Sequence, residues 1–201
     1  QLDHASPQMR IAAFRALRRN WEEINRLAAK NLESEDKSVA KKAKQETANA
    51  ELKMLVAVEA LVRDEDPAIR REGALALRDV PFGRCRDALC KIAKAYKSGD
   101  RAMLEALGTA CTGKEAECYP MFVRDLKGSN PLKWSQELAD IAWRLHVPAG
   151  VEAHRKRALS MELSAEERKQ ALDALAFTKD PKAAEAVVEI ATQPDHENEY
   201  L

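Results

Sequence analysis

The sequence predicts an all-α protein, built as an α-α superhelix of antiparallel helix pairs. Its composition favours helix, because only 7 of the 201 residues are Gly and 8 are Pro, whereas 33% are charged. Apolar residues recur at helical spacing after repeated cap signals, and short polar stretches separate the runs. No β-rich alternating run bounded by turns interrupts this pattern.

Helix starts are the clearest repeated signal. A capping residue followed by Pro occurs at Ser6-Pro7, Asp66-Pro67, Asn130-Pro131 and Asp180-Pro181. Pro is tolerated at the first helical position because its missing N–H has no partner within the helix there. Asp100 and Ser164 can cap helices without Pro, and Glu167 gives the Ser164 start the form of a capping box.

These starts and the helical spacing of apolar residues predict about eleven helices. Among the expected spans are 8–19, 51–62, 68–78, 84–96, 101–111, 115–126, 132–146, 151–159 and 182–191. Trp134, Leu138, Ile141 and Leu145 make the cleanest apolar stripe. Short loops force neighbouring helices antiparallel, and serial pairs with similar starts favour a repeat array over a closed bundle.

Two segments resemble the HEAT (armadillo-like) repeat. Asp64-Glu-Asp-Pro-Ala-Ile-Arg70, followed by small and Leu residues at 73–77, has the acidic turn, Pro, apolar residue and Arg of that pattern, and residues 6–17 resemble it nearly as well. Asp180-Pro-Lys-Ala-Ala184 keeps the turn but lacks the Arg that would brace it. The resemblance implies a single HEAT-like solenoid domain over residues 1–201.

Residues 33–51 depart from this pattern, because Lys, Glu, Asp and Ala dominate them and large apolar side chains are few. Ala, Lys, Gln and Glu are good helix formers, so we expect a polar helical insertion here. A flexible insertion is the alternative.

The second half, over residues 100–192, resembles the helical region of large exported bacterial multidomain proteins. The stretches 104–108, 138–148 and 168–177 carry this resemblance. In those proteins HEAT repeats lie between a sugar-dehydrogenase-like β-propeller and a c-type cytochrome domain. The resemblance implies a periplasmic or otherwise exported location, with a cytoplasmic one as the alternative. The start at Gln1 and the connector-like residues 193–201 suggest a segment of a larger protein, and a chain that is mature after processing is the alternative for the Gln1 start.

Charge disfavours two classes of partner. The chain has 33 Lys and Arg against 33 Asp and Glu, which removes the sequence-wide reason to expect nucleic acid or an anionic membrane. No run approaches the ~18 apolar residues of a membrane span. The basic clusters Arg15-Arg18-Arg19 and Arg155-Lys156-Arg157 are expected to be solvated, although two such clusters could line one groove.

The cysteines predict no metal site. Cys85, Cys90, Cys111 and Cys118 form no Cys-x-x-Cys pair, and His4, His146, His154 and His196 do not fall at zinc spacing with them. Cys111 and Cys118 flank a turn between two predicted helices, which makes them candidates for a disulfide in an exported protein. Two small buried residues in helix faces are the alternative. Cys85 and Cys90 should point in different directions from one helix, although each could pair with a cysteine on a neighbouring helix.

Nothing in the sequence predicts a catalytic site or a cofactor. No G-x-S-x-G signature occurs, and the adjacent carboxylates Glu22-Glu23 and Glu166-Glu167 should diverge into solvent. Trp143 and His146 lie three residues apart and could share a ligand pocket. We expect instead that Trp143 joins the core and that His146 ends its helix.

The sequence therefore favours a non-catalytic protein-interaction or domain-spacing scaffold, whose partner is another protein or a neighbouring domain. A nucleic-acid-binding HEAT-like protein is the alternative, because related helical stacks grip duplex DNA with a basic face. An enzyme or chromophore-handling protein is a third reading, which no group of residues here supports.

Overall fold

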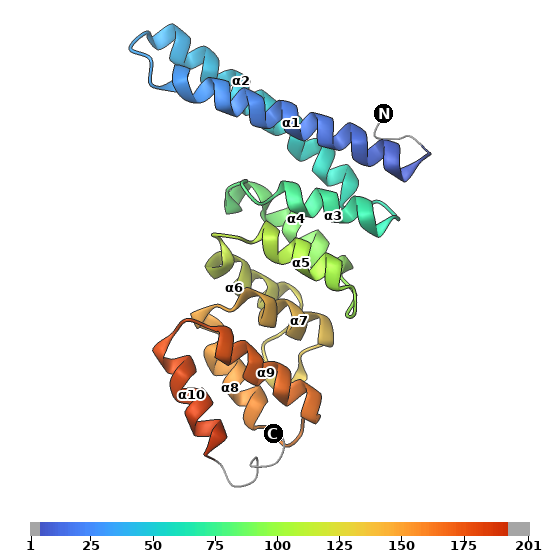
Figure 1. The fold of residues 1–201 in the computed structure, drawn as a ribbon, viewed down its shortest axis with the longest axis vertical. Coiled ribbons are helices and arrows are strands. Elements are labelled where there is room, and N and C mark those ends of the chain that lie inside the picture. The colour runs from blue at the N-terminus through green and yellow to red at the C-terminus, as the bar shows by residue number, and fades with distance from the viewer. Residues whose placement is uncertain (1–4, 193–201) are drawn as a thin grey trace. The chain divides into compact units, whose positions relative to one another are not determined.

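The computed structural model describes residues 5–192, which form ten α-helices and two 3₁₀ helices without a β-strand (Figure 1). This confirms the all-α prediction. The helices are α1 (Pro7–Leu32), α2 (Lys37–Leu61), α3 (Pro67–Ala76), α4 (Phe82–Ala95), α5 (Arg101–Ala110), α6 (Glu115–Asp125), η1 (Pro131–Lys133), α7 (Gln136–Leu145), η2 (Pro148–Gly150), α8 (Val151–Leu159), α9 (Ala165–Phe177) and α10 (Pro181–Ala191). Two compact units divide at residue 80, and each is described by itself. The predicted connector at 193–201 lies outside the described residues.

Two expected helices are parts of longer ones. The helix expected at 8–19 continues to Leu32, and the one expected at 51–62 is the end of α2, which starts at Lys37. Residues 37–51 are thus helical, with Ala43 and Ala50 as their buried apolar side chains. This helicity was expected, but its unbroken continuation into residues 51–61 was not, because the prediction weighted large apolar residues, whereas small ones suffice to bury one helix against another.

The helix expected at 132–146 is also interrupted. Asn130 caps a single 3₁₀ turn, Trp134 is extended, and α7 starts only after Ser135, whose side chain accepts a hydrogen bond from the Leu138 N–H. The cap at Ser135 therefore starts a new helix, although the spacing of the apolar residues would allow one continuous helix over 132–146. Trp134 is buried all the same, and its indole N–H donates to the Gly128 carbonyl at 2.7 Å.

In the unit of residues 1–80, α1 and α2 run antiparallel along their length, and both pack on α3 (Figure 1). The buried residues of α1 are Phe14, Trp21 and Ala28, spaced seven apart. Ala43, Ala50 and Ala57 repeat the same spacing on α2. A seven-residue repeat keeps one seam facing the partner helix, and Ala on one side makes room for Phe and Trp on the other.

Arginine braces three helix starts in the same way. Arg10, Arg70 and Arg168 each lie four residues after the cap residue, and each donates to the carbonyl just before that cap, on Ala5, Glu65 and Leu163 respectively. Arg70 also donates to the Asp64 carbonyl at 2.7 Å. The contact holds the turn that enters the helix, so the Arg of the repeat pattern has a local structural role.

Most predicted caps are confirmed. Asp66, Asp100 and Asp180 each accept a hydrogen bond from a backbone N–H in the first turn of the following helix, and Ser164 and Glu167 form the predicted capping box. Ser6 is the exception, because its side chain makes no cap hydrogen bond. Its hydroxyl lies 2.8 Å from the side-chain oxygen of Gln8 instead.

In the unit of residues 81–201, alternate helices pack in succession. α5 contacts α7 and α7 contacts α9, while α4 contacts α6 on the other side. The last three helices α8, α9 and α10 enclose one apolar cluster, with Ala158, Leu175 and Ile190 among its buried members. The apolar faces of these three helices thus meet in one shared core.

The tightest glycine of this unit is Gly128, between α6 and η1. Its N–H donates to the Val123 carbonyl at 2.6 Å and its carbonyl accepts the Trp134 indole N–H. An added Cβ would collide with Leu138 Cδ2 and lie 2.9 Å from Trp134 Nε1. By contrast, a Cβ at Gly83 on α4 would meet nothing within 4 Å.

We therefore expect Gly128→Ala to lower the free energy of unfolding by about 1–3 kcal/mol through overpacking. Gly83→Ala is the matched control and should stay within about 1 kcal/mol of the parent chain, on the stable side. Urea unfolding followed by circular dichroism measures both. Equal midpoints for the two variants would show that the chain relaxes around residue 128 at no cost.

Candidate protein-binding groove

A groove of about 400 Å³ lies across α5, α7 and α9, and we name it the Trp143 groove. Its lining residues are Tyr96, Ser98, Gly99, Arg101, Leu104, Asp140, Trp143, Glu166, Lys169, Gln170 and Asp173. They come from the end of α4, the loop after it and three helices that pack in succession. Because rigid elements supply most of the lining, the groove is held in place by the core beneath it.

Asp140 is the centre of the groove's polar lining. One of its carboxylate oxygens accepts the Tyr96 and Ser98 hydroxyls, both at 2.8 Å. The other accepts the side-chain amides of Gln136 at 2.8 Å and Gln170 at 2.7 Å. Asp140 is only 8% exposed, and burial together with its hydrogen bond raises the pKa of Tyr96. These hydrogen bonds therefore hold the four donor side chains in place around Asp140.

Trp143 lines one edge of the groove, and two further aromatic side chains continue from it outside the lining. Trp143 lies one turn after Asp140, is half-buried, and has the Arg101 guanidinium 5.0 Å from its ring centre. His146 packs edge-on to Trp143 and against Phe177, with both pairs of ring centres 5.5 Å apart. Phe177 is 63% exposed. Trp, Arg and Phe are residue types that concentrate in protein interfaces.

This geometry corrects one prediction and supports another. Trp143 lies partly in solvent at a groove, so the expectation that it joins the core is wrong. His146 ends α7 as expected, in a left-handed conformation with φ of 48°. Burial lowers the pKa of His146, and the positive charge of Arg144 adds to that effect.

The charges of the groove are unevenly matched. Asp140, Glu166 and Asp173 oppose Arg101 and Lys169. Arg101 is already paired with Glu105 at 2.6 Å, and Asp140 has no ion pair within residues 5–192. Its four donors are neutral. The groove is therefore slightly acidic, with an aromatic edge.

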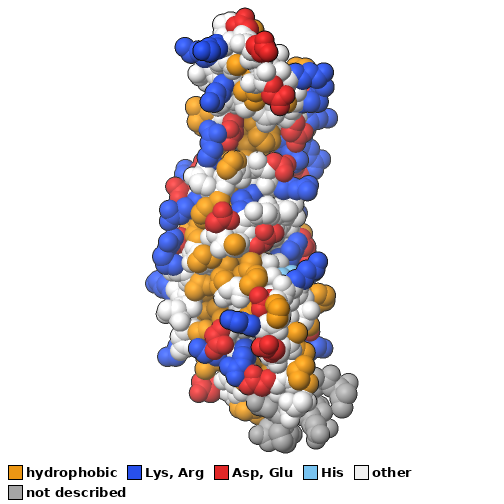
Figure 2. All heavy atoms as spheres, turned by 90° about the vertical axis from the view of Figure 1, so that its left-hand side faces the viewer, with side chains coloured by type: hydrophobic (Ala, Val, Ile, Leu, Met, Phe, Trp, Pro, Cys, Tyr) orange, Lys and Arg blue, Asp and Glu red, His pale blue; other side chains and the backbone are white. Residues whose placement is uncertain are grey.

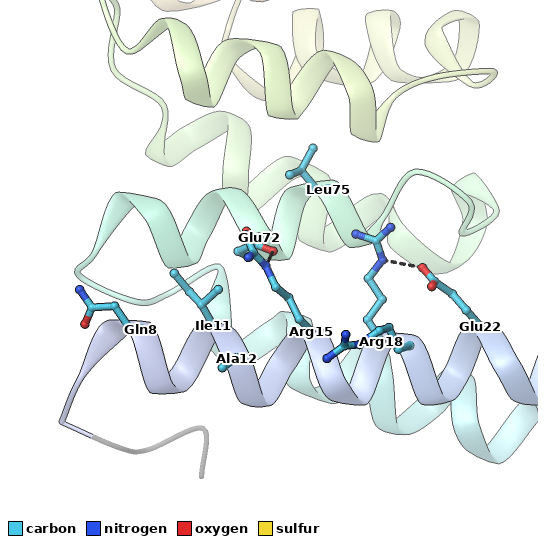
Figure 3. Close-up of a pocket in the computed structure, with 9 residues that line it drawn as sticks. Gln8, Ile11, Ala12, Arg15, Arg18, Glu22, Glu72 and Leu75 are labelled. Atoms are coloured by element: carbon cyan, nitrogen blue, oxygen red, sulfur yellow. Dashed lines mark hydrogen bonds and ion pairs between the residues drawn. The ribbon is translucent and has the colours of Figure 1, made fainter.

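A second groove, of about 790 Å³, lies between α1 and α3 (Figure 3), and we name it the arginine groove. Its lining residues are Gln8, Ile11, Ala12, Arg15, Arg18, Arg19, Glu22, Glu72 and Leu75. Arg15 makes two hydrogen bonds to the Glu72 carboxylate, which raise the pKa of Arg15. Arg18 donates through Nε to Glu22 at 2.8 Å. The first predicted basic cluster thus lines a groove.

The second predicted basic cluster is not a solvated basic face. Arg157 is 1% exposed, donates to the Pro131 carbonyl at 2.6 Å and lies 5.4 Å from the Trp134 ring centre. Arg155 is paired with Glu189 and Lys156 with Glu152. Sequence reasoning missed the burial of Arg157, although the apolar Ala158 beside it and His154 one turn earlier could have indicated a buried helix face.

Positive charge is also dispersed on the face of the molecule that Figure 2 shows. Lys and Arg side chains alternate there with Asp and Glu, and hydrophobic side chains gather between them. Glu22 pairs with Arg18, and Glu167 completes the capping box, so these two predicted surface carboxylates have structural partners.

The four cysteines are free thiols, and three of them are fully buried. Cys111 and Cys118 lie in contact, and the hydrogen bond between them, together with burial, raises the pKa of Cys111. Burial raises the pKa of Cys85 to about 11. Cys90 donates instead to the Asp125 carboxylate at 3.2 Å. The predicted disulfide between Cys111 and Cys118 stays a prediction. Buried thiols that remain protonated are poor nucleophiles.

Within the described part of the chain, no group of three or more His, Cys, Asp or Glu residues is arranged to hold a metal ion. His4 and His196 lie outside that part. None of the helices within residues 5–192 is long and apolar enough to cross a membrane.

His154 makes stability depend on pH. It is 4% exposed beside the Trp134 ring, and burial, with Arg157 adding to it, lowers the pKa of His154 from 6.5 to about 4. Between those values the unfolded chain binds a proton that the folded chain does not. The contribution of His154 to stability is therefore fully present above pH 6.5. As the pH falls through this window, the free energy of unfolding decreases by about 1.4 kcal/mol for each pH unit.

We expect His154→Phe, which keeps an aromatic ring beside Trp134, to show a shallower loss of stability than the parent chain as the pH falls from 6.5 to 4. Urea midpoints measured across this range test it. The carboxylates that titrate in the same window are common to both chains and cancel in the comparison. Parallel curves would show that His154 is already charged in the folded chain.

Comparison with known proteins gives no relative from which a role can be transferred. No family model matches the chain, and no curated protein matches it significantly.

Proposed function

We propose that this chain is a non-catalytic protein-interaction module, built as a HEAT-like solenoid, that docks or spaces the parts of a larger protein. Three helix starts braced by an equivalent Arg support a repeated unit. The successive packing of α5, α7 and α9 supports a stacked arrangement within residues 81–192. Stacked helix pairs present a continuous surface made by one helix of every pair, and such surfaces bind other proteins.

The observation that carries the proposal is the half-exposed Trp143 at the edge of its groove. A Trp ring with an Arg stacked on it offers a large contact area with few rotatable bonds. The Asp140 network below it fixes the backbone that presents the ring. A partner side chain entering here would be bound by a preformed site, which lowers the entropic cost of association.

The groove's chemistry favours protein over nucleic acid and over catalysis. Its lining carries three carboxylates against two cations, which would repel a phosphate backbone. The four hydrogen bonds to Asp140 occupy both of its oxygens, so that this carboxylate is a poor general base. The nucleic-acid alternative gains no support from the second basic cluster, whose charges are paired or buried.

We further propose that this module is part of an exported redox-type protein. It rests on the resemblance of residues 100–192 to the helical region of such proteins. In that setting the module would lie in the periplasm, and any haem would be bound by another domain, because no Cys-x-x-Cys-His occurs here. The sequence of the parent gene product on either side of this segment tests the setting.

Truncation of Trp143 tests the binding role. The tagged chain, with or without Trp143→Ala, is used to capture proteins from the organism that makes it, and bound proteins are quantified by mass spectrometry. We expect at least one partner captured by the parent chain to fall about tenfold or more with the variant, as for a central interface Trp.

Met161→Ala is the control, because Met161 is an exposed apolar residue of the same unit, 63% exposed, outside the groove lining. Its capture profile should match that of the parent chain. If both variants capture every protein as well as the parent does, the Trp143 groove is not a binding site.

A further inference from the structure

The arginine groove carries donor groups for which residues 5–192 supply no acceptor. Arg18 bonds to Glu22 through Nε alone, so both of its terminal nitrogens have no acceptor within residues 5–192. Arg19 is exposed and has no hydrogen bond or ion pair with any residue of that range. Of the three arginines, only Arg15 donates through two guanidinium nitrogens, which bond to the two carboxylate oxygens of Glu72. The groove therefore has three guanidinium groups and two carboxylates.

The shape of the groove adds an apolar component. Ile11 and Ala12 of α1 and Leu75 of α3 line it between the charged side chains, and Arg18 extends from α1 toward α3 (Figure 3). A carboxylate that approached Arg18 would meet two terminal N–H groups in the parallel geometry that guanidinium offers to carboxylates. An apolar neighbour of that carboxylate could be buried on Ile11 or Leu75.

We propose that the arginine groove binds an acidic segment of a protein partner, with Asp or Glu side chains on Arg18 and Arg19 and an apolar side chain on Ile11 and Leu75. The inference rests on the proposed function in taking a protein as the partner. It adds a second site on the other unit, with the opposite charge preference to the Trp143 groove.

Spacing favours such a segment. Arg18 and Arg19 lie three and four residues after Arg15, so each is about 5–6 Å from Arg15 on the helix surface, whereas the adjacent Arg18 and Arg19 diverge by about 100°. In an extended segment, side chains two residues apart lie on one side about 6.6 Å from each other. Two acidic residues separated by one other residue would therefore reach neighbouring guanidinium groups together.

Nucleic acid fits the same groove less well. Sequence-tolerant binding of single strands needs aromatic rings on which bases stack, and the lining has none. Glu22 and Glu72 stand among the arginines and would repel a continuous phosphate backbone, whereas they leave room for single carboxylates on Arg18 and Arg19.

Fluorescence anisotropy on the full chain tests the proposal. The probe is a labelled peptide of Glu with interspersed Leu, and the same peptide with Lys in place of Glu serves as the charge control. We expect the Glu peptide to bind and the double substitution Arg18→Glu with Arg19→Glu to weaken it about tenfold or more, because it loses charge-assisted hydrogen bonds. Arg18→Gln with Arg19→Gln should weaken it in the same direction, without adding repulsion.

The matched control is Arg26→Glu with Lys30→Glu, which changes the charge of α1 by the same amount at exposed positions outside the groove. Its affinity for the Glu peptide should stay within about twofold of the parent chain, because exposed charges at a distance are screened. Circular dichroism checks that each variant keeps its helix content.

Three results would overturn the proposal: no binding of the Glu peptide, equal weakening in the groove and control variants, or tighter Arg18-dependent binding of a labelled duplex DNA. Trp143→Ala separates this inference from the proposed function, since it should leave the Glu peptide bound. If Trp143→Ala loses partner capture and the parent chain does not bind the Glu peptide, only the proposal for the arginine groove is refuted. If binding of the Glu peptide depends on Arg18 and Trp143→Ala captures partners as well as the parent chain does, only the proposal for the Trp143 groove is refuted.

Discussion

The carboxylate of Asp140 accepts hydrogen bonds from the end of α4, the loop after it, α7 and α9. A buried carboxylate costs several kcal/mol to desolvate unless donors satisfy it, so these segments must keep their places together. Trp143 projects one turn further along α7, beside Arg101 of α5. The geometry of the groove is thus a consequence of how this one charge is accommodated, and the binding role proposed for the groove depends on that geometry.

Local chemistry explains why much of the fold could be predicted. Asp66 and Ser164 start helices because their side chains accept from first-turn N–H groups, a contact that needs only neighbouring residues. Continuity was harder to predict, because the first half of α2 buries only the small apolar side chains of Ala43 and Ala50, and α1 buries only Phe14, Trp21 and Ala28 over its whole length. The break before α7 depends on Ser135 and on a buried Trp134 outside any helix, which helical spacing alone cannot reveal.

The grooves were less accessible to sequence reasoning, because they are made by residues far apart in the chain. Arg15 and Arg18 were visible as a basic cluster, but Glu72 on α3 decides which of them is neutralised. Helical periodicity placed Trp143 beside the core, whereas its neighbours on α5 and α9 leave it half-exposed. Arg157 shows the reverse, since a residue type typical of surfaces is buried by the Pro131 carbonyl and the Trp134 ring.

Hydrogen exchange in Asp140→Ala tests most directly whether this carboxylate holds the groove together. All four donors to Asp140 belong to residues 81–192. We predict that amide protection falls together at the end of α4, in α7 and in α9, by about 2–4 kcal/mol of opening free energy, while α1 and α2 keep theirs. Unchanged protection in α9, or an equal loss from α1 to α10, would contradict the account.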